Sequence, residues 1–299
     1  MCPARQTAED RLIRDHRRQW RQCLYVYPVI SRRAEGLSVG VNLNPDKRCN
    51  FACLYCQIDR RSDRGLYQVD LATLRRELEE ALTAAGGGQL WREERFAGTP
   101  LPLRRINDIA FSGDGEPTCL PDFDRAVAVA AEVKDALGLA EVKLVVITNA
   151  SQLRSPQLQR ALPILDAHNG EIWAKLDAGT AAQFARMNRP APPVTLGRIV
   201  ADIAAVARGR EVVIQTLLCR LDGRAPADEE LDAYAGRLRE IIGGGGRIKL
   251  VQLHTVARRP ADERVTALSD VELDVLGERV RAAVRDVPVR VYYGGDRKK

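Results

Sequence analysis

The chain has 299 residues, 45% of them hydrophobic and 29% charged, a composition typical of a soluble globular protein with one large α/β domain or two small ones. No apolar run reaches the roughly 18 residues of a membrane-spanning helix, and the charged N-terminus lacks the apolar core of a signal peptide. The sequence therefore predicts a cytoplasmic protein with no membrane partner. Seven cysteines, an odd number, do not indicate a disulfide framework in such a chain.

The net charge of +6 is carried by arginines, many of them near the start of the chain. We divide the sequence into a basic N-terminal extension, residues 1–36, and one domain over residues 37–299. Within the extension, residues 7–22 predict a charged helix. A basic face can contact phosphates, which makes RNA a candidate partner. A solvated helix face explains the same pattern, and we favour that interpretation.

The elements that follow alternate between strands and helices. Residues 24–30 and 37–44 predict short extended segments, residues 70–85 an amphipathic helix with Asp70 as its N-cap, and residues 86–104 a long loop. Further strands are predicted over 106–113, 142–150, 171–179, 211–219, 248–256 and 287–294, and further helices over 121–138, 155–165, 180–188, 196–208, 227–242 and 270–284.

Strands with near-continuous apolar character, each followed by a helix, predict a parallel sheet. Five or six such units favour a partial or complete (β/α) barrel with outer helices; a doubly wound open sheet is the alternative. In either fold the functional side chains belong at the carboxyl ends of the strands.

Three cysteines lie close together in the stretch CNFACLYCQ, with the spacing Cys49-x3-Cys53-x2-Cys56. A structural zinc site has four ligands, commonly as two paired cysteines, and no second pair follows here. A thioredoxin-like pair would leave Cys49 unexplained. Soft thiolates also favour iron–sulfur clusters, and three of them can hold a [4Fe–4S] cluster while one iron stays open.

A second motif, SGDGEPT, follows the predicted strand at 106–113. Its glycines allow close backbone approach, and Glu116 can accept hydrogen bonds from an ammonium group. A plain turn between strand and helix explains such a segment when it stands alone. A dinucleotide-binding fingerprint fits poorly, because the third glycine is missing and Pro117 stands where the helix should begin.

The two motifs together resemble those of the radical S-adenosylmethionine (SAM) superfamily, and the resemblance extends over residues 37–256. It implies a partial (β/α) barrel of the radical SAM type, with Cys49, Cys53 and Cys56 holding a [4Fe–4S] cluster. It further implies reductive cleavage of SAM to a 5′-deoxyadenosyl radical, with an electron donor such as flavodoxin or ferredoxin. The residues that match the family's cofactor-binding motifs are Tyr55, Gly113, Asp114, Gly115, Glu116 and Pro117; Asp114 interrupts the family's usual glycine pair.

Further candidates lie at the predicted strand ends. Thr148 and Asn149 are expected to contact SAM, and Gln215 its ribose. Lys175 and Asp177 share one face of their strand and are candidate catalytic residues. A lysine beside a carboxylate can bind the SAM carboxylate, form a Schiff base or simply form an ion pair, and the sequence leaves these alternatives open.

Within the superfamily the chain looks most like small members related to wybutosine-type tRNA-modifying enzymes. Those enzymes carry a second cluster on three N-terminal cysteines, whereas this chain has only Cys2 and Cys23 in that region, which argues against the same reaction. We expect a radical SAM enzyme that acts on RNA or a small metabolite. The alternatives are an activase of a glycyl-radical enzyme and a non-enzymatic zinc or iron–sulfur binding module.

Overall fold

The structure, a computed structural model, describes residues 19–58, 68–258 and 260–294. Most of the helix predicted over residues 7–22 lies outside the described residues, and residues 19–22, which are described, are not helical. Within the described part of the chain, no helix is both long and apolar enough to cross a membrane.

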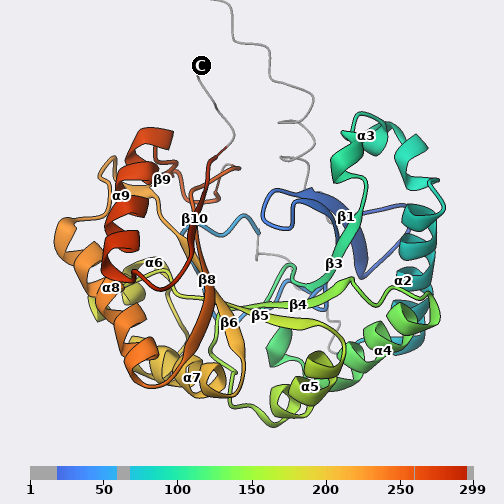
Figure 1. Cartoon of the computed structure of the whole chain (residues 1–299), viewed down its shortest axis with the longest axis horizontal. Coiled ribbons are helices and arrows are strands. Elements are labelled where there is room, and N and C mark those ends of the chain that lie inside the picture. The colour runs from blue at the N-terminus through green and yellow to red at the C-terminus, as the bar shows by residue number, and fades with distance from the viewer. Residues whose placement is uncertain (1–18, 59–67, 259, 295–299) are drawn as a thin grey trace, which may run out of the picture.

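One eight-stranded sheet forms the centre of the molecule (Figure 1). Its strands run in sequence order: β1 (Val26–Ser31), β2 (Gly36–Val41), β3 (Ile106–Phe111), β4 (Lys143–Thr148), β5 (Gly170–Lys175), β6 (Glu211–Leu217), β8 (Arg247–His254) and β10 (Val289–Tyr292). β1 pairs antiparallel with β2, and every other neighbouring pair is parallel. A sequential order without reversal is that of a barrel and excludes the doubly wound alternative.

The helices lie around the outer face of the curved sheet (Figure 1), as expected when right-handed crossovers join neighbouring parallel strands. They are α2 (Leu71–Gly86), α4 (Phe123–Ala136), α5 (Pro156–Ala167), α6 (Ala181–Met187), α7 (Leu196–Gly209), α8 (Asp228–Gly243) and α9 (Asp270–Ala283). Asp70 caps α2, as predicted, because its side chain accepts hydrogen bonds from the backbone N–H groups of Ala72 and Thr73.

The large core fills the space between helices and sheet, and a second, smaller core lies inside the curve of the sheet. Ala110, Val145, Trp173 and Val213, from four successive strands, form this inner core. β1 and β10 are the two edges of the sheet, so the barrel is open between them. The predicted partial (β/α) barrel with outer helices is confirmed.

Three details differ from the sequence prediction. The stretch 86–104, predicted as a loop, contains three short helices: η1 (Leu90–Arg92), α3 (Glu94–Ala97) and η2 (Leu101–Leu103). A small separate sheet pairs β7 (Arg220–Leu221) with β9 (Val265–Thr266), and two-residue strands are too short to leave a sequence pattern. β1 lies within the range assigned to the N-terminal extension, so the boundary at residues 36 and 37 falls inside the β1–β2 hairpin.

Candidate functional site

A cavity of about 310 Å³ lies at the carboxyl ends of the parallel strands. Ten of the fourteen site residues predicted from the sequence line it: Cys49, Cys53, Tyr55, Cys56, Gly113, Gly115, Glu116, Thr148, Asn149 and Lys175. The other four, Asp114, Pro117, Asp177 and Gln215, do not line it. Two motifs that are more than fifty residues apart in the sequence therefore line the same cavity.

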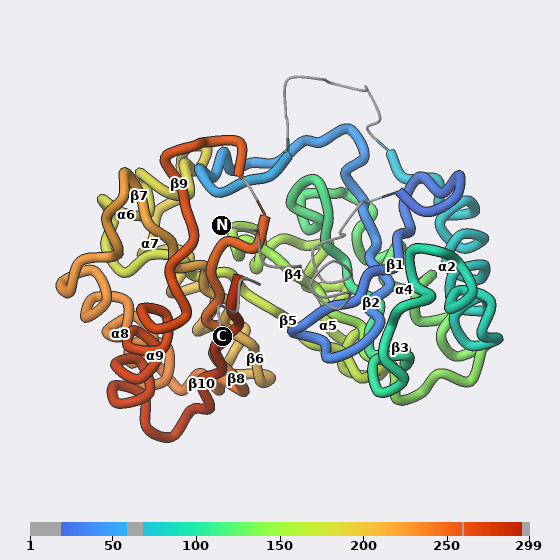
Figure 2. Tube along the Cα trace, turned by 90° about the horizontal axis from the view of Figure 1, so that it is seen from above, coloured from blue at the N-terminus to red at the C-terminus, as the bar shows by residue number. Residues whose placement is uncertain are grey.

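The cysteine loop is held in place by backbone hydrogen bonds to the last residue of α6 and to the segment that follows it. The N–H groups of Ala52 and Leu54 donate to the carbonyls of Arg189 and Met187, at 3.1 and 2.9 Å, and the Ala191 N–H donates back to the Asn50 carbonyl at 2.8 Å. Figure 2 shows the loop crossing from the end of β2 to the side of the molecule that carries α6. The cysteine loop thus connects the two sides of the half-barrel.

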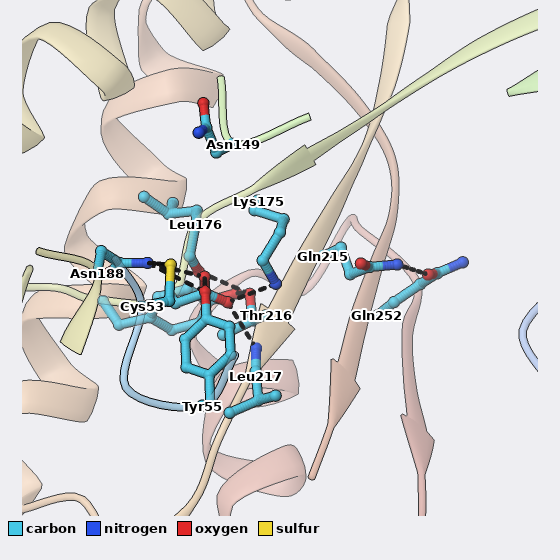
Figure 3. Close-up of polar contacts among 12 residues, drawn as sticks. Cys53, Tyr55, Asn149, Lys175, Leu176, Asn188, Gln215, Thr216, Leu217 and Gln252 are labelled. Carbon is cyan, nitrogen blue, oxygen red and sulfur yellow. Dashed lines mark hydrogen bonds and ion pairs between the residues drawn. The ribbon is translucent and has the colours of Figure 1, made fainter. Parts of the chain in front are cut away.

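Asp177 ties the cysteine loop to the ends of β5 and β6. Its carboxylate accepts hydrogen bonds from the Tyr55 hydroxyl at 2.5 Å, the Leu217 N–H at 2.8 Å, and the side-chain nitrogens of Lys175 and Asn188, both at 3.1 Å. Figure 3 shows these four donors converging from the loop, from β5 and β6, and from the end of α6. Because the Asp177 side chain is only 2% exposed, the charge of its carboxylate is balanced by these donors.

Lys175 and Tyr55 are further linked by a cation–π contact. The Lys175 ammonium lies 5.2 Å from the centre of the Tyr55 ring. Of the alternatives open for Lys175 and Asp177, the structure contains the ion pair, and Lys175 alone of the two also reaches the cavity. The Tyr55 hydroxyl donates a hydrogen bond to Asp177 and also lies beside the Cys53 thiol.

The glycines of SGDGEPT allow this segment to pack against the start of the cysteine loop. A Cβ atom on Gly115 would lie 1.8 Å from the Arg48 carbonyl oxygen, and one on Gly113 would lie 2.3 Å from Oδ1 of Asn42. Between them, Asp114 exchanges two hydrogen bonds with Asn42: its carboxylate accepts from Nδ2 at 2.8 Å and its N–H donates to Oδ1 at 3.0 Å. The close approach requires glycine at both positions.

Glu116 is buried and holds the end of β4. One carboxylate oxygen accepts from the hydroxyls of Thr118 and Thr148, at 2.5 and 2.7 Å, and the other accepts from the Asn149 N–H at 2.6 Å. Burial raises the pKa of Glu116, and these hydrogen bonds oppose the rise. The second oxygen accepts only the Asn149 hydrogen bond among the described residues, so it retains capacity for another donor.

Gln215 is directed elsewhere. It is 2% exposed, and its Nε2 donates to Oε1 of Gln252 on the neighbouring strand at 3.1 Å. Figure 3 shows this pair set apart from the donors that surround Asp177. The position does not bring Gln215 to the cavity wall.

The three cysteines fit an iron–sulfur cluster in the chemistry of their donors. All three are partly buried, and none is in a disulfide. Burial raises the pKa of the Cys53 thiol to about 12, so a metal must displace its proton on binding. Among the described residues, no three histidine, cysteine, aspartate or glutamate side chains are placed to hold one metal ion. A [4Fe–4S] cluster does not require the three thiolates to meet at one metal ion, because each thiolate binds its own iron.

Two contributors were missed by sequence reasoning. Asn188 follows α6 and donates to Asp177 and to the Tyr55 hydroxyl, both at 3.1 Å, and Tyr55 is 133 residues away in the sequence. No local pattern indicates such a contact. Asn42 had a signal, because it lies in the polar stretch that ends the predicted strand 37–44.

None of the known protein-family models matches the chain. A curated relative, "GTPase Obg" of Brachyspira hyodysenteriae, is 28% identical over 254 residues, which are 83% of this chain and 32% of that protein. A "UPF0026 protein" of Helicobacter pylori is 27% identical over 252 residues, 82% of this chain and 70% of the relative. This chain thus spans about a third of the length of the first relative.

Among solved structures, a radical SAM methyltransferase from Sphaerobacter thermophilus has a similar fold. The match has a TM-score of 0.61 at 16% identity and covers 90% of this chain and 69% of the other. The chain therefore has the fold of the radical SAM enzymes, and the resemblance predicted from the two motifs is confirmed for the fold.

Proposed function

We propose that this chain, whose fold is that of the radical SAM enzymes, is itself such an enzyme and cleaves SAM reductively with a [4Fe–4S] cluster on Cys49, Cys53 and Cys56. The observation that supports this most strongly is the meeting of the three cysteines with Gly113, Gly115 and Glu116 at one cavity. When bound, the cluster and SAM supply the radical chemistry, and the protein supplies position and shelter from water.

The chain's own residues have distinct roles in this proposal. The Glu116 oxygen that accepts only from Asn149 is placed to accept a hydrogen bond from the SAM ammonium. Thr148 and Asn149 are held in place by Glu116 and form the wall beside it. Asp177 is a positioning residue, because it fixes Tyr55 and thereby the second half of the cysteine loop.

We propose RNA or a small metabolite as the substrate and flavodoxin or ferredoxin as the electron donor. The basis is the sequence resemblance to tRNA-modifying members of the superfamily, together with the basic charge of the chain.

Anaerobic reconstitution of the full chain with iron and sulfide tests the proposal. We expect about four irons and four sulfides per chain, and 5′-deoxyadenosine after reduction in the presence of SAM. Cys53→Ala should lose both. Cys119→Ala is the matched control: this exposed cysteine lies outside the cavity lining and should leave both unchanged.

Two outcomes would overturn the proposal. One is a protein that takes up zinc but neither iron nor sulfide. The other is a fully reconstituted protein that leaves SAM intact. Loss of the cluster in Cys119→Ala would instead show that Cys119 is a fourth ligand of the cluster. No iron would then be left open for SAM.

A further inference from the structure

Three polar side chains form a closed ring of hydrogen bonds between the cysteine loop and the end of β4. Nδ2 of Asn50 donates to Oγ of Ser151 at 2.7 Å, and this hydroxyl donates to Oδ1 of Asn149 at 2.6 Å. Nδ2 of Asn149 then donates back to Oδ1 of Asn50 at 2.8 Å. Each side chain of this polar ring therefore donates once and accepts once, and hydrogen bonds in such a sequence strengthen one another.

The backbone beside the polar ring adopts a conformation that most residues avoid. Ala150, between Asn149 and Ser151, is fully buried and has a φ of 64°, in the left-handed region. This region costs an alanine about 1–2 kcal/mol. The Ser151 N–H donates to Oδ1 of Asn149 at 3.0 Å, so the turn is held by a side chain of the ring itself. Strain of this kind is frequent at functional sites, where the surrounding contacts maintain it.

The polar ring lies between the two motifs that meet at the cavity. On one side, Asn50 directly follows Cys49 in the sequence. On the other, the backbone N–H of Asn149 donates to the Glu116 carboxylate at 2.6 Å. The first cysteine is therefore connected to Glu116 through one covalent neighbour and two hydrogen-bonded contacts.

The side chain of Asn149 serves the ring more than it serves a ligand, although Asn149 also lines the cavity. Its Oδ1 accepts from both the hydroxyl and the N–H of Ser151, which occupies the two lone pairs of that oxygen. One of the two Nδ2 hydrogens is used by Asn50. These contacts leave a single amide hydrogen of Asn149 for a bound molecule.

We propose that Asn50, Asn149 and Ser151 are positioning residues, which fix the cysteine loop relative to Glu116 and so align a cluster on the loop with the site for the SAM ammonium. A molecule that contacts two groups at once binds well only when both are held in register, and small misplacements are costly. This inference rests on the proposed function and goes beyond it, because none of the three side chains needs to touch the cluster or SAM to act in this way.

Titration of the reconstituted full chain with SAM tests the ring, with the change in the electron paramagnetic resonance spectrum of the reduced cluster as the readout. Ser151→Ala opens the ring without altering the cysteine loop, so it should take up as much iron as the wild type. We expect it to need about 10-fold more SAM for half of the spectral change. Asn169→Gly is the matched control: the Asn169 amide donates to the Glu141 carbonyl at the opposite end of the barrel, and its φ of 56° suits glycine. Its SAM affinity should equal that of the wild type.

A double-mutant cycle tests whether the ring acts as one unit. Asn50→Ala removes two of its three hydrogen bonds, so adding Ser151→Ala should lower SAM affinity little further. Wild-type SAM affinity in Ser151→Ala, or a loss in the double variant equal to the product of the two single losses, would contradict the inference. Iron uptake below that of the wild type in either single variant would show that the ring is needed for the cluster itself, and would overturn a role limited to position.

Hydrogen exchange without SAM separates this inference from the proposed function. The amides of Asn149 and Ser151 donate to Glu116 and to the Asn149 side chain. Their exchange should slow about tenfold when the cysteines are loaded with iron and sulfide, or with zinc if the chain takes up only zinc, and should not slow in Asn50→Ala. If this slowing depends on Asn50 but SAM stays intact, the ring is supported and the proposed function fails. If SAM is cleaved but the slowing is absent or persists in Asn50→Ala, the ring is overturned and the proposed function stands.

Discussion

At the scale of single residues, Asp177 is the side chain on which the cysteine loop depends most. Asp177→Ala leaves Tyr55 and Lys175 without their shared partner in a largely buried place. We expect the free energy of unfolding to fall by about 3–5 kcal/mol, measured by urea denaturation. Asp232→Ala is the control: Asp232 also pairs with an arginine, but its side chain is 75% exposed, so the loss should stay within about 1 kcal/mol. Equal losses would contradict the role of Asp177.

Asp108, inside the barrel, makes stability depend on pH. Its carboxyl is 3% exposed and accepts a hydrogen bond from Ser38 at 2.5 Å, and burial raises its pKa from 3.8 to about 6. Ionisation therefore favours the unfolded chain. The stability that this group contributes is fully present below about pH 4 and is lost as the pH rises through 6.

Asp108→Asn should remove this dependence. The variant should match the wild type near pH 4 and exceed it by about 3 kcal/mol near pH 7, because the shift spans about two pKa units. Asp124→Asn is the matched control. The Arg160 guanidinium lowers the pKa of Asp124, so this variant should instead lose stability relative to the wild type as the pH rises. Chemical denaturation at several pH values measures both, and the same trend in both variants would refute the assignment.

At the scale of elements, the packing of SGDGEPT against the cysteine loop leaves the least room for an added side-chain atom. Gly115→Ala places a methyl group against the Arg48 carbonyl, one residue before Cys49. Since backbone cannot yield as a flexible side chain does, we expect the loop to shift and the chain to bind iron less completely. Gly197→Ala, in α7, meets nothing within 4 Å and should be neutral or stabilise by up to about 1 kcal/mol. Full iron content in Gly115→Ala would contradict the expectation.

The elements were largely predictable, because their signals are local. The apolar run at residues 142–150 and the Ser155-Pro156 helix start both correspond to observed elements, β4 and α5. What the sequence does not contain is the meeting of distant segments. Asn188 contacts Tyr55 across 133 residues, and Asn149 contacts Asn50 across 99. Neither has a period or a spacing that marks it beforehand.

At the scale of the whole molecule, the cysteine loop acts as a bridge over an open barrel. It leaves β2, packs against the turn after β3, and pairs with residues 187–191 on the other side. A ligand that binds the three cysteines fixes the cysteine loop, which is one partner in each of these contacts. Binding to the folded state alone must therefore stabilise both sides of the bridge together.

Hydrogen exchange of the full chain before and after cluster reconstitution tests this coupling. The amides of Ala52, Leu54 and Ala191 make the hydrogen bonds across the bridge. With the cluster bound, these hydrogen bonds can open only if the loop also detaches from the cluster, so their exchange should slow on the order of tenfold. Amides in the middle of β4, already buried in the sheet, should not change. Cys53→Ala, treated in the same way, should show no slowing at any of the three. If slowing stays confined to Ala52 and Leu54 and spares Ala191, the loop binds its cluster without joining the two sides of the barrel.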